Sequence, residues 1–379
     1  MSARRSLTAT VSLAAEAAGV YLRHAFVEPL RSTPSLPRAM HYLSTHRCNA
    51  RCVMCGIWKE GDTAEEDLSP AELARILADP LFSRMEYVGI SGGEPFLRED
   101  LILLLEAFLE HCPRLKRLSL TTNGLIPARM EAGLAELADL ANAAGVLFDV
   151  SVSVHGVGAT LERIYGVPRA FDKMERGVRL LEDLRNQGRL TFSFNCVLLA
   201  DNLESVRDLT RWAGERGIPV SFVIGEQRDR FRTDGLETAF VSPEHREELL
   251  AFLRSVADDP AQGAPSAVKY RELADVLEGR GTRRLSCYYA MGGLLLGHDG
   301  TLYYCSHSRA IGNCRDNAPR AIYYQPDNLM YRRRELQHRK CPACPPYTRT
   351  RWEIEKDLPR MLAAAVLRRL RPGRSSSDS

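Results

Sequence analysis

The stretch that decides the fold of this chain reads His46-Arg47-Cys48-Asn49-Ala50-Arg51-Cys52-Val53-Met54-Cys55-Gly56-Ile57-Trp58. Three residues separate its first two cysteines, and two residues separate the second from the third. This spacing can bring three thiolates onto one face of a small loop, enough to ligate three irons of a 4Fe-4S cube and leave the fourth iron open. Cysteines scattered in a core and a zinc knuckle are the alternatives, but zinc sites more often use paired Cys-x-x-Cys ligands. The stretch therefore predicts Cys48, Cys52 and Cys55 as cluster ligands.

Composition and charge set the broad class of the protein. With 379 residues, 45% hydrophobic and 26% charged, the chain lies near the average of globular proteins and is long enough for a main and an accessory domain. A formal net charge of +3 gives no electrostatic footprint for nucleic acid, so we expect no nucleic-acid partner. Disulfides of a secreted protein are not indicated by the ten cysteines, because a low-potential iron–sulfur cluster needs a reducing compartment. We therefore expect a cytoplasmic protein.

Short apolar runs alternate with longer amphipathic segments from Met40 onward, which is typical of repeated βα units around a parallel sheet. The strand-like runs are 40–45, 85–91, 115–121, 147–154, 190–199 and 219–224. Helical patterns lie between them at 69–78, 98–110, 128–143, 171–187 and 203–216. Six such units are two short of a closed (β/α)8 barrel. The expected fold is therefore α/β, a partial (β/α)6 TIM-like barrel that is open on one side.

A second motif follows the second predicted strand, where the chain reads Ser91-Gly92-Gly93-Glu94-Pro95. Two glycines let the backbone approach a ligand closely while its amide and carbonyl groups stay free to bond it. The cysteine spacing and this segment together resemble the signature of the radical S-adenosylmethionine (radical SAM) superfamily. The resemblance implies that the amino and carboxylate groups of SAM chelate the open iron, and that Gly92, Gly93, Glu94 and Pro95 contact its methionine amino group. It also implies reductive cleavage of SAM to a 5′-deoxyadenosyl radical, which abstracts a hydrogen atom from the substrate.

Further strand ends supply weaker candidates. The resemblance implies that Ser153 contacts the SAM carboxylate or ribose, that Arg163 pairs with the carboxylate, and that Asn195 binds the adenosine moiety. Met54 stands where relatives usually carry an aromatic residue and can pack on the adenine through its sulfur. His155 replaces the aspartate of the family pattern, and it is either a substrate-side acid/base group or a loop histidine. The run 121–124 is either a ligand contact or an Asn-Gly turn.

A second group of cysteines lies near the end of the chain. Cys287 and Cys305 can lie on neighbouring strands of a hairpin formed across 298–300, where Asp-Gly marks the turn. With Cys341 and Cys344 they are similar to the Twitch domain, the shorter relative of the SPASM domain, which implies one auxiliary 4Fe-4S cluster; a zinc site is the alternative. The further cysteines of a full SPASM pattern are missing. Cys314 is left over as a replacement ligand, a hydrogen donor to a substrate radical, or a buried core residue.

The expected domain order completes the organisation. It comprises an amphipathic extension (1–39), the barrel (40–225), a helical linker (226–284), a small α+β auxiliary-cluster domain (285–346) and a C-terminal helix with a disordered tail (347–379). Within the linker, a helix at 243–256, a loop at 258–267 and a short helix at 268–279 are predicted. Both terminal helices carry arginines beside an apolar stripe, so they either touch a membrane surface or pack onto the barrel.

Three functional hypotheses remain open at this level. The first is an oxidation, either dehydrogenation or crosslinking, in which the substrate radical loses an electron to the auxiliary cluster and a proton to His155 or a nearby tyrosine. The second is a redox-neutral epimerisation with Cys314 as hydrogen donor. The third is an iron–sulfur electron-transfer protein without catalysis. The substrate can be a small molecule, a sugar, a lipid or a peptide, and a flavodoxin or ferredoxin is the expected reductant.

Overall fold

A computed structural model describes residues 33–227, 231–237, 240–259, 263–281 and 287–344. The predicted helix and tail at 347–379, and all but a few residues of the predicted extension at 1–39, lie outside these ranges. The described residues fall into two compact units. The larger consists of Ser35–Arg246 with Gly292–Leu336, and the smaller of Glu247–Met291 with 337–344. Each unit is described by itself.

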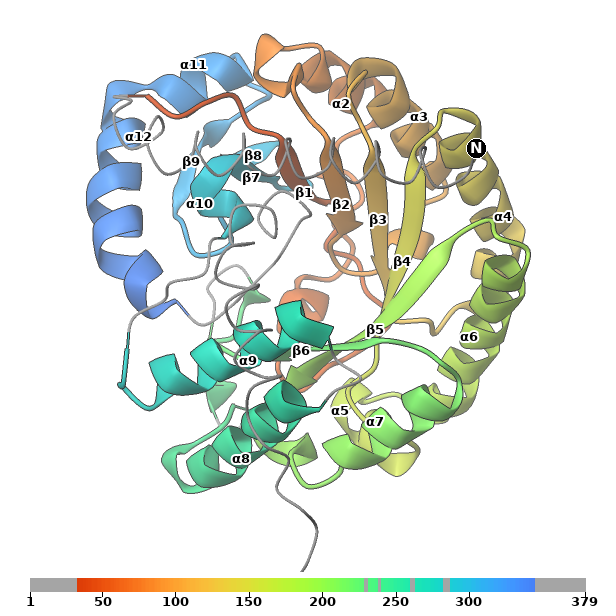
Figure 1. Cartoon of the computed structure of the whole chain (residues 1–379). Helices are drawn as coiled ribbons and strands as arrows, with labels where there is room; N and C mark the ends of the chain where they lie inside the picture. Colours follow the sequence, from red (N-terminus) through yellow and green to blue (C-terminus); the bar gives the residue numbers. More distant parts are fainter. Residues whose placement is uncertain (1–32, 228–230, 238–239, 260–262, 282–286, 345–379) are drawn as a thin grey trace, which may run out of the picture. The chain divides into compact units, whose positions relative to one another are not determined.

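The larger unit is built on one sheet whose first six strands are parallel (Figure 1). The strands are β1 (Ala39–Leu43), β2 (Tyr87–Ser91), β3 (Arg117–Thr122), β4 (Leu147–Ser153), β5 (Thr191–Leu198) and β6 (Val220–Ile224). The order across the sheet is β6-β5-β4-β3-β2-β1-β7-β8-β9, so the outermost described strands do not pair and the barrel stays open. The predicted partial barrel of six βα units is thereby confirmed, with strand ends shifted by no more than a few residues.

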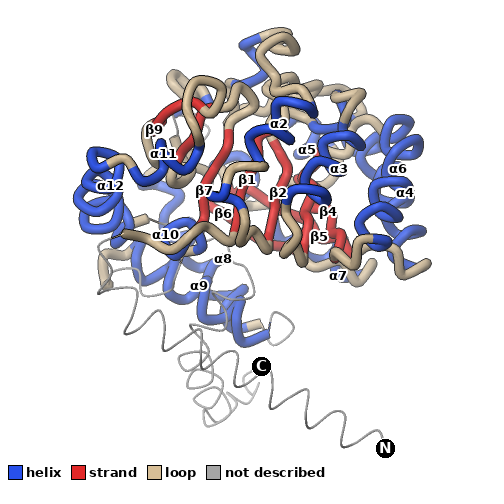
Figure 2. The backbone as a smooth tube through the Cα atoms, turned by 90° about the horizontal axis from the view of Figure 1, so that it is seen from above, coloured by secondary structure: helices blue, strands red, loops and turns tan. Residues whose placement is uncertain are grey.

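Helices cover the outer face of the parallel strands (Figures 1 and 2). They are α2 (Pro70–Leu77), α3 (Leu101–His111), α4 (Pro127–Ala143), α5 (Ala159–Tyr165), α6 (Ala170–Asn186) and α7 (Val206–Glu215). The predicted start of α2 is correct in detail, because Ser69 caps the Glu72 amide and the Glu72 carboxylate reaches back to Ser69. The short helix α5 was not predicted. Brief 3-10 turns are η3 (Ile57–Glu60), η4 (Pro80–Phe82), η5 (Pro95–Leu97) and η6 (Ala200–Asn202).

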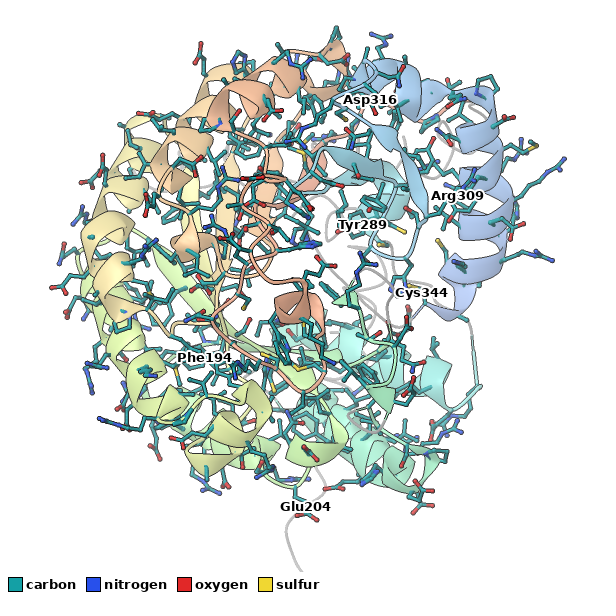
Figure 3. All side chains as sticks on the ribbon, turned by 180° about the vertical axis from the view of Figure 1, so that it is seen from behind. Phe194, Glu204, Tyr289, Arg309, Asp316 and Cys344 are labelled. Carbon is teal, nitrogen blue, oxygen red and sulfur yellow. The ribbon has the colours of Figure 1, made fainter. Side chains whose placement is uncertain are left out.

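Alternate residues of each strand point toward these helices and form the core. Tyr42 of β1 meets Phe108 of α3 edge-on, with ring centroids 5.7 Å apart. Phe194 of β5, labelled in Figure 3, stacks on Trp212 of α7 with ring centroids 5.3 Å apart. Burying an aromatic side chain of this size contributes roughly 2 to 3 kcal/mol. These contacts identify the outer face of the sheet and leave the intervening residues on the inner, concave face.

The β1 edge of the parallel sheet is extended by a C-terminal hairpin. Strand β7 (Gly293–Leu296) pairs in parallel with β1, and β8 (Thr301–Tyr303) and β9 (Ala310–Asn313) follow antiparallel. The predicted hairpin across 298–300 is confirmed. The prediction that Cys287 and Cys305 lie on its two strands is wrong, because Cys287 precedes the short helix α10 (Tyr288–Gly292) and Cys305 follows the end of β8. The hairpin is followed by α11 (Pro319–Tyr324), α12 (Pro326–Tyr331) and the π-helical segment η11 (Arg332–Lys340).

The smaller unit contains two longer helices besides most of the short helix α10. They are α8 (Arg246–Asp258), which follows the 3-10 turn η9 (Pro243–His245), and α9 (Gly263–Leu277). The loop predicted at 258–267 is largely wrong, because α9 begins at Gly263 and extends through the Ala-rich part of that segment. Arg271 joins the two helices by a 2.6 Å ion pair with Asp258. Within the described ranges, no helix is long and apolar enough to cross a membrane.

Candidate radical-generating site

The cysteine loop leaves the carboxyl end of β1 and is held by backbone hydrogen bonds. Arg51 N donates to Tyr165 O at 2.8 Å and Val53 N to Ile164 O at 2.9 Å, so the end of α5 supports the middle of the loop. Cys55 N donates to Cys52 O at 3.0 Å and turns the last two cysteines toward each other. The unpredicted helix α5 is thus a support for the loop.

The three thiols suit an iron–sulfur cluster. Burial raises the pKa of Cys48 to about 12 and that of Cys52 well above its ordinary value. Such thiols stay protonated unless a cation stabilises the thiolates, and iron provides that cation. A cube takes one thiolate on each iron, so its ligands do not converge on one point. Within the described residues, no group of three or more His, Cys, Asp or Glu side chains is placed around a single metal ion.

The Gly-Gly-Glu-Pro turn after β2 packs directly on the cysteine loop. Gly93 N donates to Thr45 O at 2.6 Å, and Glu94 N donates to Arg47 O at 2.8 Å. A Cβ atom on Gly93 would collide with the Arg47 carbonyl group, and one on Gly92, whose φ is +138°, would collide with Thr45 O. Both glycines are therefore required for the close approach of two loops. Contact of this segment with SAM stays a prediction.

Glu94 connects this turn to the next strand end. Its carboxylate is fully buried and accepts hydrogen bonds from Thr122 Oγ1 at 2.8 Å, Asn123 N at 2.7 Å and Phe96 N at 3.2 Å. Burial raises its pKa to about 7, against the lowering effect of these donors. Pro95, also buried, begins the 3-10 turn η5. Glu94 thus joins the loops after β2 and β3.

Asn123 carries the connection on to the cluster loop. Its Nδ2 donates to Asn49 Oδ1 at 2.8 Å and lies 3.8 Å from Cys48 Sγ. Its Oδ1 accepts from Leu125 N at 2.9 Å, and Gly124 turns the chain with φ of +72°. The segment is therefore both a turn and a contact of the cysteine loop. A hydrogen bond to a ligand sulfur is one of the features that set the reduction potential of an iron–sulfur cluster.

His155 lies buried beneath the ends of β4 and β5. Its Nδ1 accepts a hydrogen bond from Val197 N at 3.1 Å, and its ring meets Tyr165 edge-on at 5.6 Å. Asn202 Nδ2 donates to both His155 O and Val197 O at 2.8 Å. Burial lowers the pKa of His155 to about 4. These contacts hold His155 neutral and join the two strand ends.

The other predicted SAM contacts lie on two strand ends, on α5 and in the cysteine loop. Ser153 and Asn195 face each other in the β4–β5 register with half-exposed side chains. Arg163 is about half exposed, and its Nη2 donates to Asp201 O at 2.9 Å. Met54 lies half-buried in the cysteine loop. The structure thus places Ser153 and Asn195 together, whereas Arg163 is occupied by Asp201.

A contact between two histidine rings beside the cysteine loop, tilted by 43° to each other, was not predicted. His46 and His298 lie 3.9 Å apart between ring centroids, so the β7–β8 turn touches the start of the loop. His46 Nδ1 is 2.7 Å from Glu60 Oε2, and the other oxygen of this carboxylate, Oε1, binds Arg232. His298 Nδ1 is 3.0 Å from Asp67 Oδ1. Burial and the neighbouring His298 lower the pKa of His46. His46 and His298 are far apart in the sequence, so no local sequence pattern could have predicted this contact.

The second group of cysteines is divided between the two units. Cys305 follows β8, and its Sγ accepts from His307 N at 3.4 Å. Cys341 and Cys344 flank one 3-10 turn, with Cys344 N donating to Cys341 O at 3.3 Å. Cys287, Cys341 and Cys344 belong to the smaller unit and Cys305 to the larger one. A shared cluster of these four cysteines stays a prediction.

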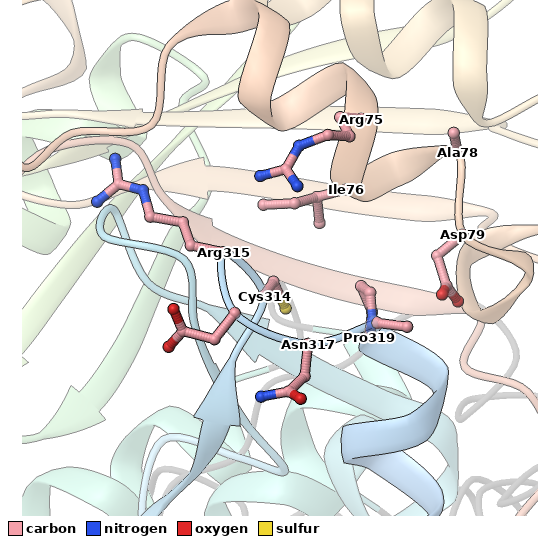
Figure 4. A pocket seen from close by; sticks show the side chains of 10 residues that line it. Arg75, Ile76, Ala78, Asp79, Cys314, Arg315, Asn317 and Pro319 are labelled. Carbon is pink, nitrogen blue, oxygen red and sulfur yellow. The ribbon is translucent and has the colours of Figure 1, made fainter.

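Cys314 lies in the larger unit and lines a pocket of about 410 Å³ (Figure 4). The other walls are residues of α2 and its C-terminal turn, together with the segment leading into α11. Cys314 is 4% exposed, and burial raises the pKa of its thiol to about 12. Because α2 covers the outer face of the sheet, this pocket opens on the side of the helices.

Comparison with known proteins agrees with this geometry. The family model described as "Radical SAM superfamily" matches residues 42–213. GTP 3′,8-cyclase of Cronobacter sakazakii is 31% identical over 246 residues, covering 61% of this chain and 70% of that protein. The chain belongs to the radical SAM superfamily. A probable GTP 3′,8-cyclase of Sulfurisphaera tokodaii is 29% identical, but this radical SAM chain spans only about half of its length (51%).

Solved structures share the fold of this radical SAM protein. Streptococcus suis SuiB bound to S-adenosylmethionine superposes with a TM-score of 0.57 at 16% identity, covering 82% of this chain and 71% of SuiB. The protein anSMEcpe, solved with bound AdoMet and the Cp18Cys peptide, gives 0.54 at 16% identity and covers 87% and 99%. At these identities the likeness concerns the fold alone. A SAM-cleaving enzyme that carries a 4Fe-4S cluster follows from the superfamily.

Proposed function

We propose that this radical SAM enzyme oxidises a small polar substrate inside its open barrel. The observation that carries the proposal is the three-thiol loop at the end of β1, held against the Gly-Gly-Glu-Pro turn by the hydrogen bonds Gly93 N to Thr45 O and Glu94 N to Arg47 O. When bound there, a reduced 4Fe-4S cluster and SAM supply the 5′-deoxyadenosyl radical that removes a hydrogen atom from the substrate. The protein's part is to place the ligands and to exclude water.

The SAM-binding residues we propose lie at the carboxyl ends of the strands. The glycine turn 92–95 approaches the cysteine loop, and the half-exposed pair Ser153 and Asn195 extends the same edge of the sheet. Met54 stands in the cysteine loop itself. Arg163 is the proposed partner of the SAM carboxylate; one N–H of its Nη2 bonds Asp201 O, and a guanidinium has five donors.

An auxiliary cluster would account for the oxidation. We assign Cys287, Cys305, Cys341 and Cys344 to one 4Fe-4S cluster because two cysteines with seventeen residues between them and a late Cys-x-x-Cys provide the four thiolates that such a cluster needs. A substrate C–H hydrogen atom would pass to the 5′-deoxyadenosyl radical, which gives 5′-deoxyadenosine and leaves a substrate radical. The remaining radical would then give one electron to this cluster and one proton to a base.

His41 is the base we propose for that proton. Its Nε2 lies 2.5 Å from Ser91 Oγ on the inner face of the sheet. His155, the residue that the sequence suggested, is buried and accepts a backbone hydrogen bond at Nδ1. We assign His155 to positioning the ends of β4 and β5 instead.

The experiment that tests the function measures 5′-deoxyadenosine released from SAM by the reconstituted, dithionite-reduced protein. Release supports the radical reaction, and its absence leaves only an electron-transfer protein. Iron analysis tests the auxiliary cluster: about eight irons per chain supports two cubes, and about four refutes the second. Cys287→Ser should lower the iron content by about half while leaving the first cluster in place. Reduced flavodoxin or ferredoxin should be able to replace dithionite as the electron donor in the 5′-deoxyadenosine assay.

A rearrangement of GTP is the second candidate function. The supporting observation is the 31% identity to GTP 3′,8-cyclase of Cronobacter sakazakii over 70% of that protein. Incubation with GTP, SAM and reductant distinguishes this rearrangement from the proposed oxidation, because a cyclase consumes GTP without net oxidation. Epimerisation through Cys314 has less support, because the pocket that this thiol lines faces the helix α2 on the outer side of the sheet.

A further inference from the structure

The two faces of the parallel sheet have opposite chemical character. On the outer face Val150, Val152 and Phe194 are buried against helices. On the inner face β4 and β5 carry polar residues of intermediate exposure at alternate positions, including Ser151, Ser193 and Asn195. Closed (β/α)8 barrels fill this interior with Val, Ile and Leu side chains. At β4 and β5 the inner face is therefore not a packed apolar core, unlike its β1–β7 part, where Leu43 and Leu295 are buried.

Hydroxyl groups cross this face as a row. Thr121 of β3 pairs in register with Ser151 of β4, and Ser151 pairs with Ser193 of β5. These three residues lie side by side on three adjacent strands, two residues before the ends that carry Ser153 and Asn195. We call Thr121, Ser151 and Ser193 the hydroxyl row. It lies directly beneath the edge proposed for SAM.

The hydroxyl row has unused hydrogen-bonding capacity. Within the described part of the chain, the side chains of Thr121, Ser151 and Ser193 make no hydrogen bond, although each is partly covered. A partly buried hydroxyl that lacks a protein partner loses free energy unless water or a ligand bonds to it. Three adjacent groups, each able to donate and accept, match a ligand with several hydroxyl groups.

A second set of polar groups lies closer to the amino ends of the strands. Asp149 accepts from Arg117 Nε at 2.7 Å and from Ser119 Oγ at 3.1 Å. A Cβ on Gly89 would lie 3.3 Å from Tyr87 Oη, so the Tyr87 side chain lies along the same inner face. Arg117 is thus already paired with a carboxylate. The described inner face provides no surplus positive charge of the kind that binds a polyphosphate.

We propose that the hydroxyl row binds a neutral, polyhydroxylated substrate, such as a sugar, a cyclitol or a nucleoside, rather than a nucleoside triphosphate or an acyl lipid. The inference rests on the proposed function, because it places the substrate carbon beneath the SAM edge. The hydroxyl row supplies hydrogen-bond donors and acceptors without net charge. The Arg117–Asp149 ion pair, in which the two charges cancel, adds no net charge either. An acyl chain would leave these hydroxyl groups without partners.

The test measures equilibrium binding to the reconstituted holoprotein with SAM and without reductant. The probes are radiolabelled myo-inositol, methyl glucoside and uridine as neutral compounds, GTP as a polyanion, and monoolein as a lipid. We expect at least one neutral compound to bind and the Ser151→Ala/Ser193→Ala variant to weaken it about tenfold or more, because each lost hydrogen bond costs a factor of about 2 to 10. The matched control is Ser83→Ala, an exposed serine whose hydroxyl bonds only Pro80 O.

Binding of GTP or monoolein alone, no binding of any neutral probe, or equal binding by the double variant overturns the inference. Release of 5′-deoxyadenosine without substrate is measured separately, on portions of the same protein preparations after reduction with dithionite. If that release is normal while no neutral probe binds, the substrate class is wrong and the radical function stands. If release is absent, the proposed function itself fails. A double variant that retains this release and its melting temperature is folded, so its binding result is decisive.

Discussion

Replacement of Gly93 by alanine should separate the glycine turn from the cysteine loop. The added Cβ would stand 2.6 Å from Arg47 C and 2.8 Å from His46 O, as well as meeting Arg47 O directly. Carbon atoms in contact lie about 3.5 Å apart, so one loop must move by roughly 1 Å. That movement breaks the hydrogen bonds from Gly93 N and Glu94 N, each worth about 1 kcal/mol. Overpacking adds about 1 to 3 kcal/mol.

The expected loss of stability for Gly93→Ala is therefore about 4 kcal/mol. For a unit of this size it lowers the melting temperature of the cluster-free protein by roughly 10 °C. Because the moved segment includes Arg47, next to the first ligand Cys48, the variant should also retain less iron after reconstitution. Differential scanning calorimetry and iron analysis measure the two effects separately.

Gly133→Ala is the matched control. Gly133 lies in the middle of α4, and a Cβ there meets nothing within 4 Å. Alanine at this position should stabilise the protein by about 1 kcal/mol, through helix propensity and a less flexible unfolded chain. If Gly93→Ala melts and binds iron like the control, the two loops are not held by the close approach described above, and the argument is refuted.

Three further outcomes are expected. His155→Asn keeps an acceptor for Val197 N but cannot titrate. Because the pKa of His155 is about 4 in the folded and about 6.5 in the unfolded protein, the free energy of unfolding of the wild type should fall by about 3 kcal/mol between pH 6.5 and pH 4. The variant should not show this fall, and urea titrations at the two pH values measure it. Asn123→Asp replaces the donor near Cys48 Sγ with a negative charge and should lower the reduction potential of the cluster by roughly 40 mV or more, as measured in an EPR-monitored titration. The control Asn142→Asp, which loses only a hydrogen bond to Arg189 O, should leave the potential unchanged. Cys314→Ala should leave substrate turnover unchanged if the reaction is an oxidation and abolish it if Cys314 donates a hydrogen atom.

Most of the fold could be predicted because each strand and helix of the barrel has a local cause. Strands alternate on one period and helices on another, and Ser69 with Glu72 marks a helix start directly. The short helix α5 escaped prediction because seven residues with a glycine at each end give too little periodicity. The start of α9 was missed for the opposite reason, since proline and glycine suggested a loop although both stand in its first turn.

The candidate site, too, has a part that the sequence predicts and a part that it does not. The ligand cysteines and the glycine turn are contiguous motifs, so their spacing reveals them. The contacts of Glu94 with Thr122 and Asn123, and of His46 with His298, depend on strand order and on which loops meet. The hydroxyl row depends on register, because Thr121, Ser151 and Ser193 become neighbours only when three strands align. A sequence pattern specifies alternation within a strand and leaves this alignment open.

The pairing of β1 with β7 has a consequence for biosynthesis. During translation β1 can pair with β2 early, but its second neighbour is made only after the whole parallel barrel has left the ribosome, since Ala39 pairs with Gly293. Until then the strand that leads into the cysteine loop is an exposed edge. Iron delivered to a nascent chain would meet an incomplete loop, because His298 has not yet reached His46. Cluster insertion should therefore follow chain completion, and nascent chains stalled before β7 should not retain iron.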